Sequence, residues 1–135
     1  MRFADTNVLL YAISTDPREE QQAAVATSLL DGGDIVLSVQ VLQEFYVQAT
    51  RLSRRDRLDG SVAAELVATF QRFPVVPVTP QIVTAAIATH RRYDISYWDA
   101  AILEAARSAG CDVVLSEDLS HTVDYGGIRV ENPFT

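Results

Sequence analysis

The stretch MRFADTNVLLYA, residues 1–12, determines how the chain begins to fold. The apolar pair Phe3 and Ala4 leads directly to Asp5, and an apolar run over residues 8–12 follows two small polar residues. This order predicts a short buried strand that ends at Asp5 and turns at once into a helix. In open α/β sheets, ligands bind beyond the carboxyl ends of the strands, where Asp5 would lie. Asp5 could instead serve only as a helix cap, a position that Asp favours.

Apolar strands alternate with helical patterns along the rest of the chain. Short apolar runs predict four more strands, at residues 35–37, 75–76, 112–115 and 128–130. Helical periodicity predicts helices over residues 17–30, 39–52, 60–73, 79–92 and 96–110. Prolines on both sides of residues 75–76 place that strand near a sheet edge. We therefore expect one α/β domain over residues 1–135, with a parallel sheet and helices on both of its faces.

The composition excludes several classes of protein. The chain is 48% hydrophobic and 21% charged, which is typical of a globular domain rather than a disordered one. It has no apolar run of about 18 or more residues and no secretion signal, so we expect a cytoplasmic protein that does not enter a membrane. The single cysteine, Cys111, excludes an internal disulfide and fits a reducing compartment.

The net charge of −7 argues against a general electrostatic attraction to nucleic acid, because that attraction depends on Lys and Arg meeting phosphates. It does not exclude a nucleic acid substrate if the acidic residues gather round cations. All eleven basic residues are Arg, whose planar guanidinium group suits both phosphate and carboxylate partners.

Four acidic residues stand out by position: Asp5, Glu44, Asp99 and Asp118. Asp5 and Asp118 follow predicted strands, Glu44 lies on the helix after the second strand, and Asp99 lies in the first turn of a later helix. Each has a structural alternative. Asp5 and Asp118 could be helix caps, Asp99 could favour the helix dipole, and Glu44 could share a solvated helix face with Gln40.

The surroundings of Asp99 favour a functional role. Residues 97–103 are apolar nearly all round the helix apart from Asp99, which predicts that this helix is buried. An acid on a buried helix should be paired or functional, because an isolated buried charge is costly.

The segments around these acids resemble the PIN domain, and they occur in the order found in that family. They are residues 5–11 (DTNVLLY), 43–45 (QEF), 97–100 (YWDA) and 115–119 (LSEDL). The ending at residues 128–134 also resembles that of many bacterial PIN proteins, so the resemblance covers essentially the whole chain. The most similar subclass is the VapC toxin of type II toxin–antitoxin pairs.

The resemblance implies a three-layer α/β/α fold with a central, mainly parallel sheet. It implies that the four acids bind Mg²⁺ or Mn²⁺ and that the protein is an endoribonuclease that hydrolyses RNA. Asn7 and Ser116 would support the site, and Glu117 could share the role of Asp118. The resemblance also implies a cognate antitoxin and a homodimer.

The chemistry of the four acids agrees with this implication. Carboxylates held close together repel one another unless a cation neutralises them. Hard divalent cations prefer oxygen ligands, and the absence of Cys and His from the set argues against zinc. A bound metal can activate water and stabilise the attacking and leaving oxygens of a phosphodiester.

Two questions stay open at the level of sequence. Arg51, Arg54 and Arg55 could hold RNA phosphates, or they could belong to a solvated segment paired with Asp56 and Asp59. The chain could also be a PIN-fold module that binds RNA or protein without cutting. Its four acids favour an enzyme.

Overall fold

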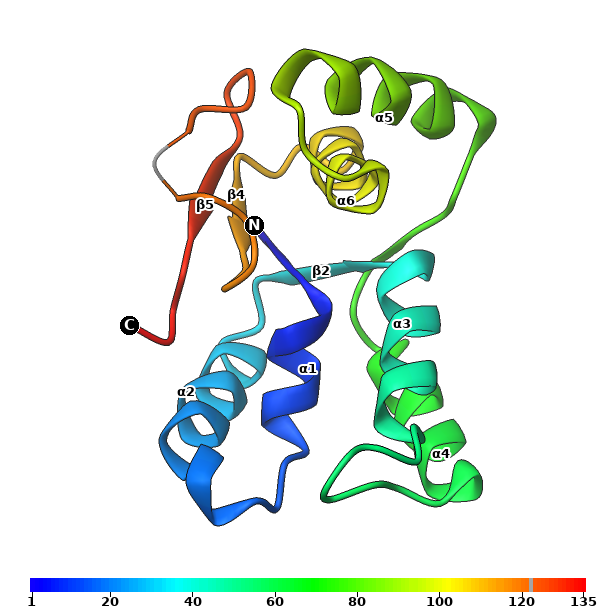
Figure 1. Cartoon of the computed structure of the whole chain (residues 1–135), viewed down its shortest axis with the longest axis vertical. Coiled ribbons are helices and arrows are strands. Elements are labelled where there is room, and N and C mark those ends of the chain that lie inside the picture. Colours follow the sequence, from blue (N-terminus) through cyan, green and yellow to red (C-terminus); the bar gives the residue numbers. More distant parts are fainter. Residues whose placement is uncertain (122) are drawn as a thin grey trace.

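A five-stranded sheet forms the centre of the computed structural model, which describes residues 1–121 and 123–135 (Figure 1). The strands are β1 (Arg2–Ala4), β2 (Ile35–Ser38), β3 (Val75–Val76), β4 (Val113–Leu115) and β5 (Arg129–Glu131). Their order is β3-β2-β1-β4-β5, and all four pairings of neighbouring strands are parallel. The predicted parallel sheet is confirmed, as is the edge position of β3.

Helices cover both faces of this sheet. They are α1 (Thr6–Ala12), α2 (Glu20–Asp31), α3 (Val39–Ala49), α4 (Gly60–Phe70), α5 (Pro80–Tyr93) and α6 (Tyr97–Ser108), with a short 3-10 helix at Pro17–Glu19. Figure 1 shows α5 and α6 on one side of the sheet and α1 to α4 on the other. The predicted three-layer α/β/α fold is therefore confirmed. Within the described residues, no helix is both long and apolar enough to cross a membrane.

Hydroxyl side chains fix where several helices begin. The hydroxyl oxygens of Ser38, Thr79 and Ser96 accept hydrogen bonds from backbone N–H groups in the first turns of α3, α5 and α6. These caps satisfy donors that a helix start leaves free. Because β1 runs into α1 and β2 into α3 without a loop, residues at these junctions are held firmly at the carboxyl edge of the sheet.

Helices α3 and α4 end earlier than the periodicity predicts. The predicted helix over residues 39–52 stops at Ala49, whose carbonyl accepts a hydrogen bond from the N–H of Leu58 as the chain turns back. Leu52 consequently lies 83% exposed rather than on an apolar inner face. The predicted helix over residues 60–73 ends at Phe70. Helices α3 and α4 pack against each other, yet Tyr46 and Val47 on α3 and Val62 on α4 remain exposed.

Candidate active site

The four predicted acids lie at one edge of the sheet. Asp5 directly follows β1, Asp118 follows β4, Glu44 lies on the helix that continues β2, and Asp99 lies in the first turn of α6. Strands β2, β1 and β4 are neighbours and run parallel, so their carboxyl ends share this edge. Burial raises the pKa of both Asp5 and Asp99, and the negative charges of Glu44 and Asp118 add smaller increases. The fold therefore places these four acids close enough together for their charges to interact.

Asp5 is the most deeply buried of the four, with 5% of its surface exposed. One carboxylate oxygen accepts a hydrogen bond from the N–H of Thr6 at 2.7 Å, and the other accepts one from the Ser116 hydroxyl at 2.8 Å. Burial raises the pKa of Asp5 to about 6; the two hydrogen bonds oppose this rise, and nearby Glu44 and Asp118 add to it. Asp5 thus caps α1 and also carries a charge that no cation offsets within the described residues.

Glu44 is held from two sides. The Thr6 hydroxyl donates to its Oε2 at 2.8 Å, and the amide of Gln40 donates to its Oε1 at 2.9 Å. Gln40 also donates to the backbone carbonyl of Trp98 at 3.2 Å. The solvated helix face considered for Gln40 is wrong, because Gln40 is only 8% exposed. Its spacing of four residues from Glu44, one helical turn, is the sequence signal that could have suggested this contact.

Asp118 lies beside both predicted supporting residues. The amide nitrogen of Asn7 donates to Asp118 Oδ2 at 3.1 Å, and the Ser116 hydroxyl accepts from the backbone N–H of Asp118 at 3.1 Å. Ser116 therefore links Asp5 and Asp118 directly. Glu117 is held differently, because the Tyr11 hydroxyl donates to both of its carboxylate oxygens, at 2.9 and 3.0 Å.

Asp99 is half-buried at the start of α6. Its backbone N–H donates to the Ser96 hydroxyl at 3.0 Å, which completes the predicted cap. Burial raises the pKa of the Asp99 carboxyl; a side-chain hydrogen bond between this carboxyl and Ser96 opposes the rise, and the charges of Asp118 and Glu44 reinforce it. The prediction that residues 97–103 are buried is wrong at the helix start, because Trp98 is 64% exposed and Tyr97 is only partly buried.

The donor set fits a hydrated divalent cation. All four acids offer oxygen, and the buried Oδ1 of Asn7 beside them has no hydrogen-bond partner. Within the described residues, no three His, Cys, Asp or Glu side chains lie close enough together to enclose a metal ion. Mg²⁺ does not require such a cage, since it usually binds one or two carboxylates and keeps several waters.

A polar pocket of about 240 Å³ adjoins the acids and contains one of the three predicted arginines. Arg54 lines it together with Asn7, Glu117 and Asp118. Its guanidinium group forms an ion pair with Asp56 at 3.0 Å and donates to the carbonyl of Leu10 at 3.4 Å.

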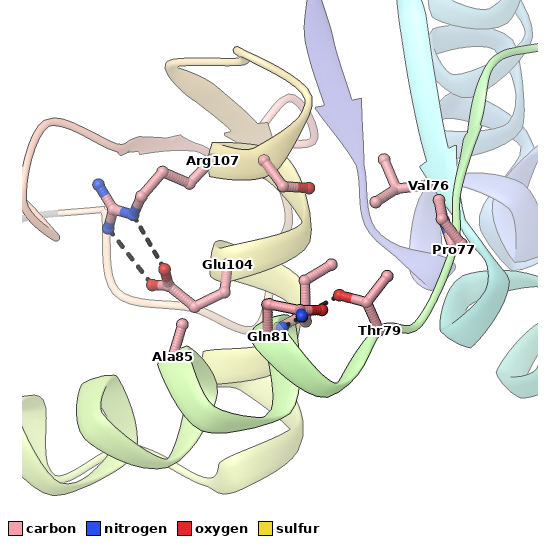
Figure 2. Close-up of a pocket in the computed structure, with 9 residues that line it drawn as sticks. Val76, Pro77, Thr79, Gln81, Ala85, Glu104 and Arg107 are labelled. Carbon is pink, nitrogen blue, oxygen red and sulfur yellow. Dashed lines mark hydrogen bonds and ion pairs between the residues drawn. The ribbon is translucent and has the colours of Figure 1, made fainter.

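The other two arginines and a second cavity lie outside this network. Arg51 and Arg55 are exposed. A cavity of about 290 Å³ lies between α5 and α6, where Glu104 and Arg107 form an ion pair with each other (Figure 2).

Comparison with known proteins points to one family. A sequence model described as the PIN domain matches residues 2–122. Among solved structures, VapC20 from Mycobacterium tuberculosis, a sarcin–ricin loop cleaving toxin, is 22% identical with a TM-score of 0.68, over 87% of this chain and 92% of that one. A toxin–antitoxin complex from Klebsiella pneumoniae gives 19% identity and a TM-score of 0.72, over 99% and 98%.

DNA-bound VapBC from Salmonella typhimurium gives 20% identity and a TM-score of 0.69, over 98% of this chain and 97% of that one. At these identities the structural likeness establishes the fold. Among curated proteins, none matches this sequence significantly.

Proposed function

The chain belongs to the PIN domain family, and on this premise we propose that it is a metal-dependent endoribonuclease. The observation that carries the proposal is the gathering of Asp5, Glu44, Asp99 and Asp118 at one sheet edge. Asp5 is buried there among other acids, which is costly unless a cation binds. A phosphodiester can approach this cluster of acids only if a cation is bound there, because the acids alone would repel the RNA backbone.

Each residue has a defined part in this proposal. Asp5, Asp99 and Asp118 would hold Mg²⁺ or Mn²⁺, in part through the waters that the ion keeps, and the metal would supply an activated water and neutralise charge on the phosphate. Thr6 and Gln40 fix the Glu44 carboxylate, so that it can orient a water molecule or accept a proton without moving.

Ser116 and Asn7 hold two of the acids in position by hydrogen bonds. Ser116 joins Asp5 to the backbone of Asp118, and Asn7 holds the Asp118 side chain. Hydrolysis by water would leave a 5′-phosphate and a 3′-hydroxyl. The four retained acids favour an enzyme over the alternative, a PIN-fold module that binds RNA or protein without cutting.

We further propose that the protein is the toxin of a VapBC-type pair, acts in the cytoplasm, forms a homodimer and is bound by a cognate antitoxin. The support is that similar structures are toxins or toxin–antitoxin complexes. Expression of the chain alone should arrest growth, and co-expression of the adjacent small gene should relieve the arrest. Growth unaffected by the active protein would exclude the toxin role while leaving the nuclease role intact.

An RNA cleavage assay tests the nuclease directly. Structured and unstructured RNAs are incubated with the protein in Mg²⁺, in Mn²⁺ or in EDTA. We expect cleavage with either metal and none in EDTA. Cleavage that is indifferent to EDTA, or full activity in folded Asp5→Ala and Asp99→Ala proteins, would overturn the mechanism.

A further inference from the structure

Trp98 is a large aromatic residue left open to solvent at the start of α6, and its backbone carbonyl accepts a hydrogen bond from Gln40, which also holds Glu44. It immediately precedes Asp99 in the first turn of α6, and 64% of its surface is exposed. We propose that Trp98 forms a stacking platform for an RNA base next to the scissile phosphate. The inference rests on the proposed nuclease function and adds a residue that positions the substrate.

The backbone that carries the indole is hydrogen-bonded, and a neighbouring ring contacts the indole itself. Gln40 donates hydrogen bonds to both Glu44 and the backbone carbonyl of Trp98, so one side chain ties the acid on α3 to the start of α6. The ring of Tyr97 meets the indole edge to face, with centroids 5.0 Å apart and planes at 82°. A stacking surface held in this way loses little conformational freedom when a base binds.

Amide groups lie next to the indole. A pocket of about 80 Å³ between α3 and α6 is lined by Gln40, Gln43, Tyr97 and Trp98, among other residues. Gln40 is engaged with Glu44, whereas Gln43 is exposed. An amide can both donate to and accept from the edge of a base. A base stacked on Trp98 would therefore have Gln43 within the same pocket as a polar partner.

The charge of the protein explains why a stacking contact is needed. With a net charge of −7, the chain has little general attraction for phosphates. Arg54, which lines the polar pocket beside the acids, is already paired with Asp56. Stacking on an aromatic ring does not depend on phosphate charge and tolerates any base, so it can hold single-stranded RNA where electrostatics cannot.

The single tryptophan makes this inference measurable, because all indole fluorescence reports on Trp98. The experiment uses the full chain in Mg²⁺, carrying Glu44→Gln, which removes the proposed proton acceptor to prevent cleavage but leaves Asp5, Asp99 and Asp118 to hold the metal. It is titrated with an eight-nucleotide single-stranded RNA, and separately with an abasic ribose-phosphate oligomer of the same length and charge. We expect RNA to quench the fluorescence and the abasic oligomer to leave it nearly unchanged.

Variants of Trp98 then measure how much the indole contributes to RNA binding. In the same background, Trp98→Ala should weaken RNA binding roughly 10- to 100-fold, measured with end-labelled RNA, and Trp98→Phe should restore most of it. Val62→Ala, another exposed apolar residue but on α4, is the matched control and should bind like the parent. Melting temperatures of all variants confirm that they are folded.

Three outcomes would overturn the inference. Equal RNA affinity in the parent and Trp98→Ala proteins would remove the stacking role while leaving the nuclease proposal standing. Self-association that Trp98→Ala abolishes, without any effect of RNA on fluorescence, would assign the indole to a second copy of the chain. Failure of the parent to bind any RNA would defeat the proposed function itself, together with this inference.

Discussion

Asp5 and Glu104 are both buried carboxylates, 5% and 7% exposed, yet their surroundings are opposite. Glu104 on α6 accepts hydrogen bonds from Arg107 at 3.0 Å and from the Thr89 hydroxyl at 2.8 Å. Figure 2 shows the Arg107 guanidinium group paired with the Glu104 carboxylate one turn away on the same helix. Asp5 has neutral donors, Ser116 and the Thr6 N–H, and its charged neighbours are other acids.

This difference separates an acid that stabilises the fold from one available to a ligand. A buried charge is tolerated when a partner compensates it, and Arg107 compensates Glu104. Asp5 has no such partner within the described residues, so its burial stores an electrostatic cost that a bound cation would relieve. The two regions should therefore respond in opposite ways to substitution.

The largest effect is expected for activity at the acidic edge. Asp99→Asn keeps the size of the side chain but removes its charge. We expect RNA cleavage to fall at least about 100-fold, because losing even a residue that only holds a metal ligand in place typically costs about 10- to 100-fold. The measurement is the initial cleavage rate in Mg²⁺. Asp112→Asn, at the opposite end of β4, is the matched control and should cleave at the normal rate. Equal rates for both variants would contradict the site assignment.

The next effect is on stability in the Glu104 region. Arg107→Met leaves Glu104 buried without its cation and also removes donors to the carbonyls of Tyr125 and Gly126. We expect the free energy of unfolding to fall by about 3 kcal/mol, as when one partner of a buried ion pair is deleted. Denaturant titration measures this change.

The exposed ion pair of Arg129 and Glu131 supplies the control for Arg107. Arg129→Met should cost less than about 1 kcal/mol, because surface pairs contribute little. Cleavage per folded molecule should be unchanged in both variants. Similar losses of stability in the two would show that the Glu104 pair has no special structural role.

Asp5→Asn should change stability in the opposite direction. The folded state holds the Asp5 proton more tightly than the unfolded chain, since its pKa rises from 3.8 to about 6. The stability that this group contributes is full below pH 3.8 and is lost as the pH rises through 6.

Asp5→Asn removes the carboxyl that costs stability when it ionises, and the amide keeps an oxygen that can cap α1. Without divalent metal at pH 7, we expect the variant to be more stable than the parent by about 3 kcal/mol, and the gain should fall below about 1 kcal/mol near pH 4. Unfolding titrations at the two pH values test this. A variant less stable than the parent at pH 7 would show that Asp5 is a structural acid like Glu104.

The smallest effect concerns positioning. Gln40→Ala frees the Glu44 carboxylate without removing its charge, so cleavage should fall about 10-fold, as expected for loss of an outer-shell partner. Gln71→Ala, just beyond α4, is the control and should retain full activity. A Gln40→Ala protein as active as the control would show that Thr6 alone suffices to hold Glu44.

Sequence patterns predict most of this fold because its elements are locally encoded. Apolar runs mark the strands, and Ser38 and Ser96 mark helix starts, since a hydroxyl cap acts within a few residues. Asp99 could be identified because an acid within an apolar helix is conspicuous. The convergence of the four acids at one edge follows from the parallel sheet.

Contacts between distant elements escape such patterns. Gln40 is spaced like a residue on a solvated face, and only the packing of α3 against the start of α6 buries it. Trp98 has an apolar side chain on a helix that is otherwise largely buried, yet 64% of its surface is exposed. The pairing of Glu104 with Arg107 is local, but the attachment of Arg107 to Tyr125 depends on the tertiary fold.

The central claim is that the acidic edge is a cation site. Thermal unfolding in increasing concentrations of Mn²⁺ tests this claim most directly. At pH 7 the parent should gain about 2.7 kcal/mol of stability when Mn²⁺ reaches about 100 times its dissociation constant. Asp5→Asn should gain far less over the same range, and Asp112→Asn should follow the parent. Absence of any gain in the parent, or an equal gain in the parent and Asp5→Asn, would contradict the account.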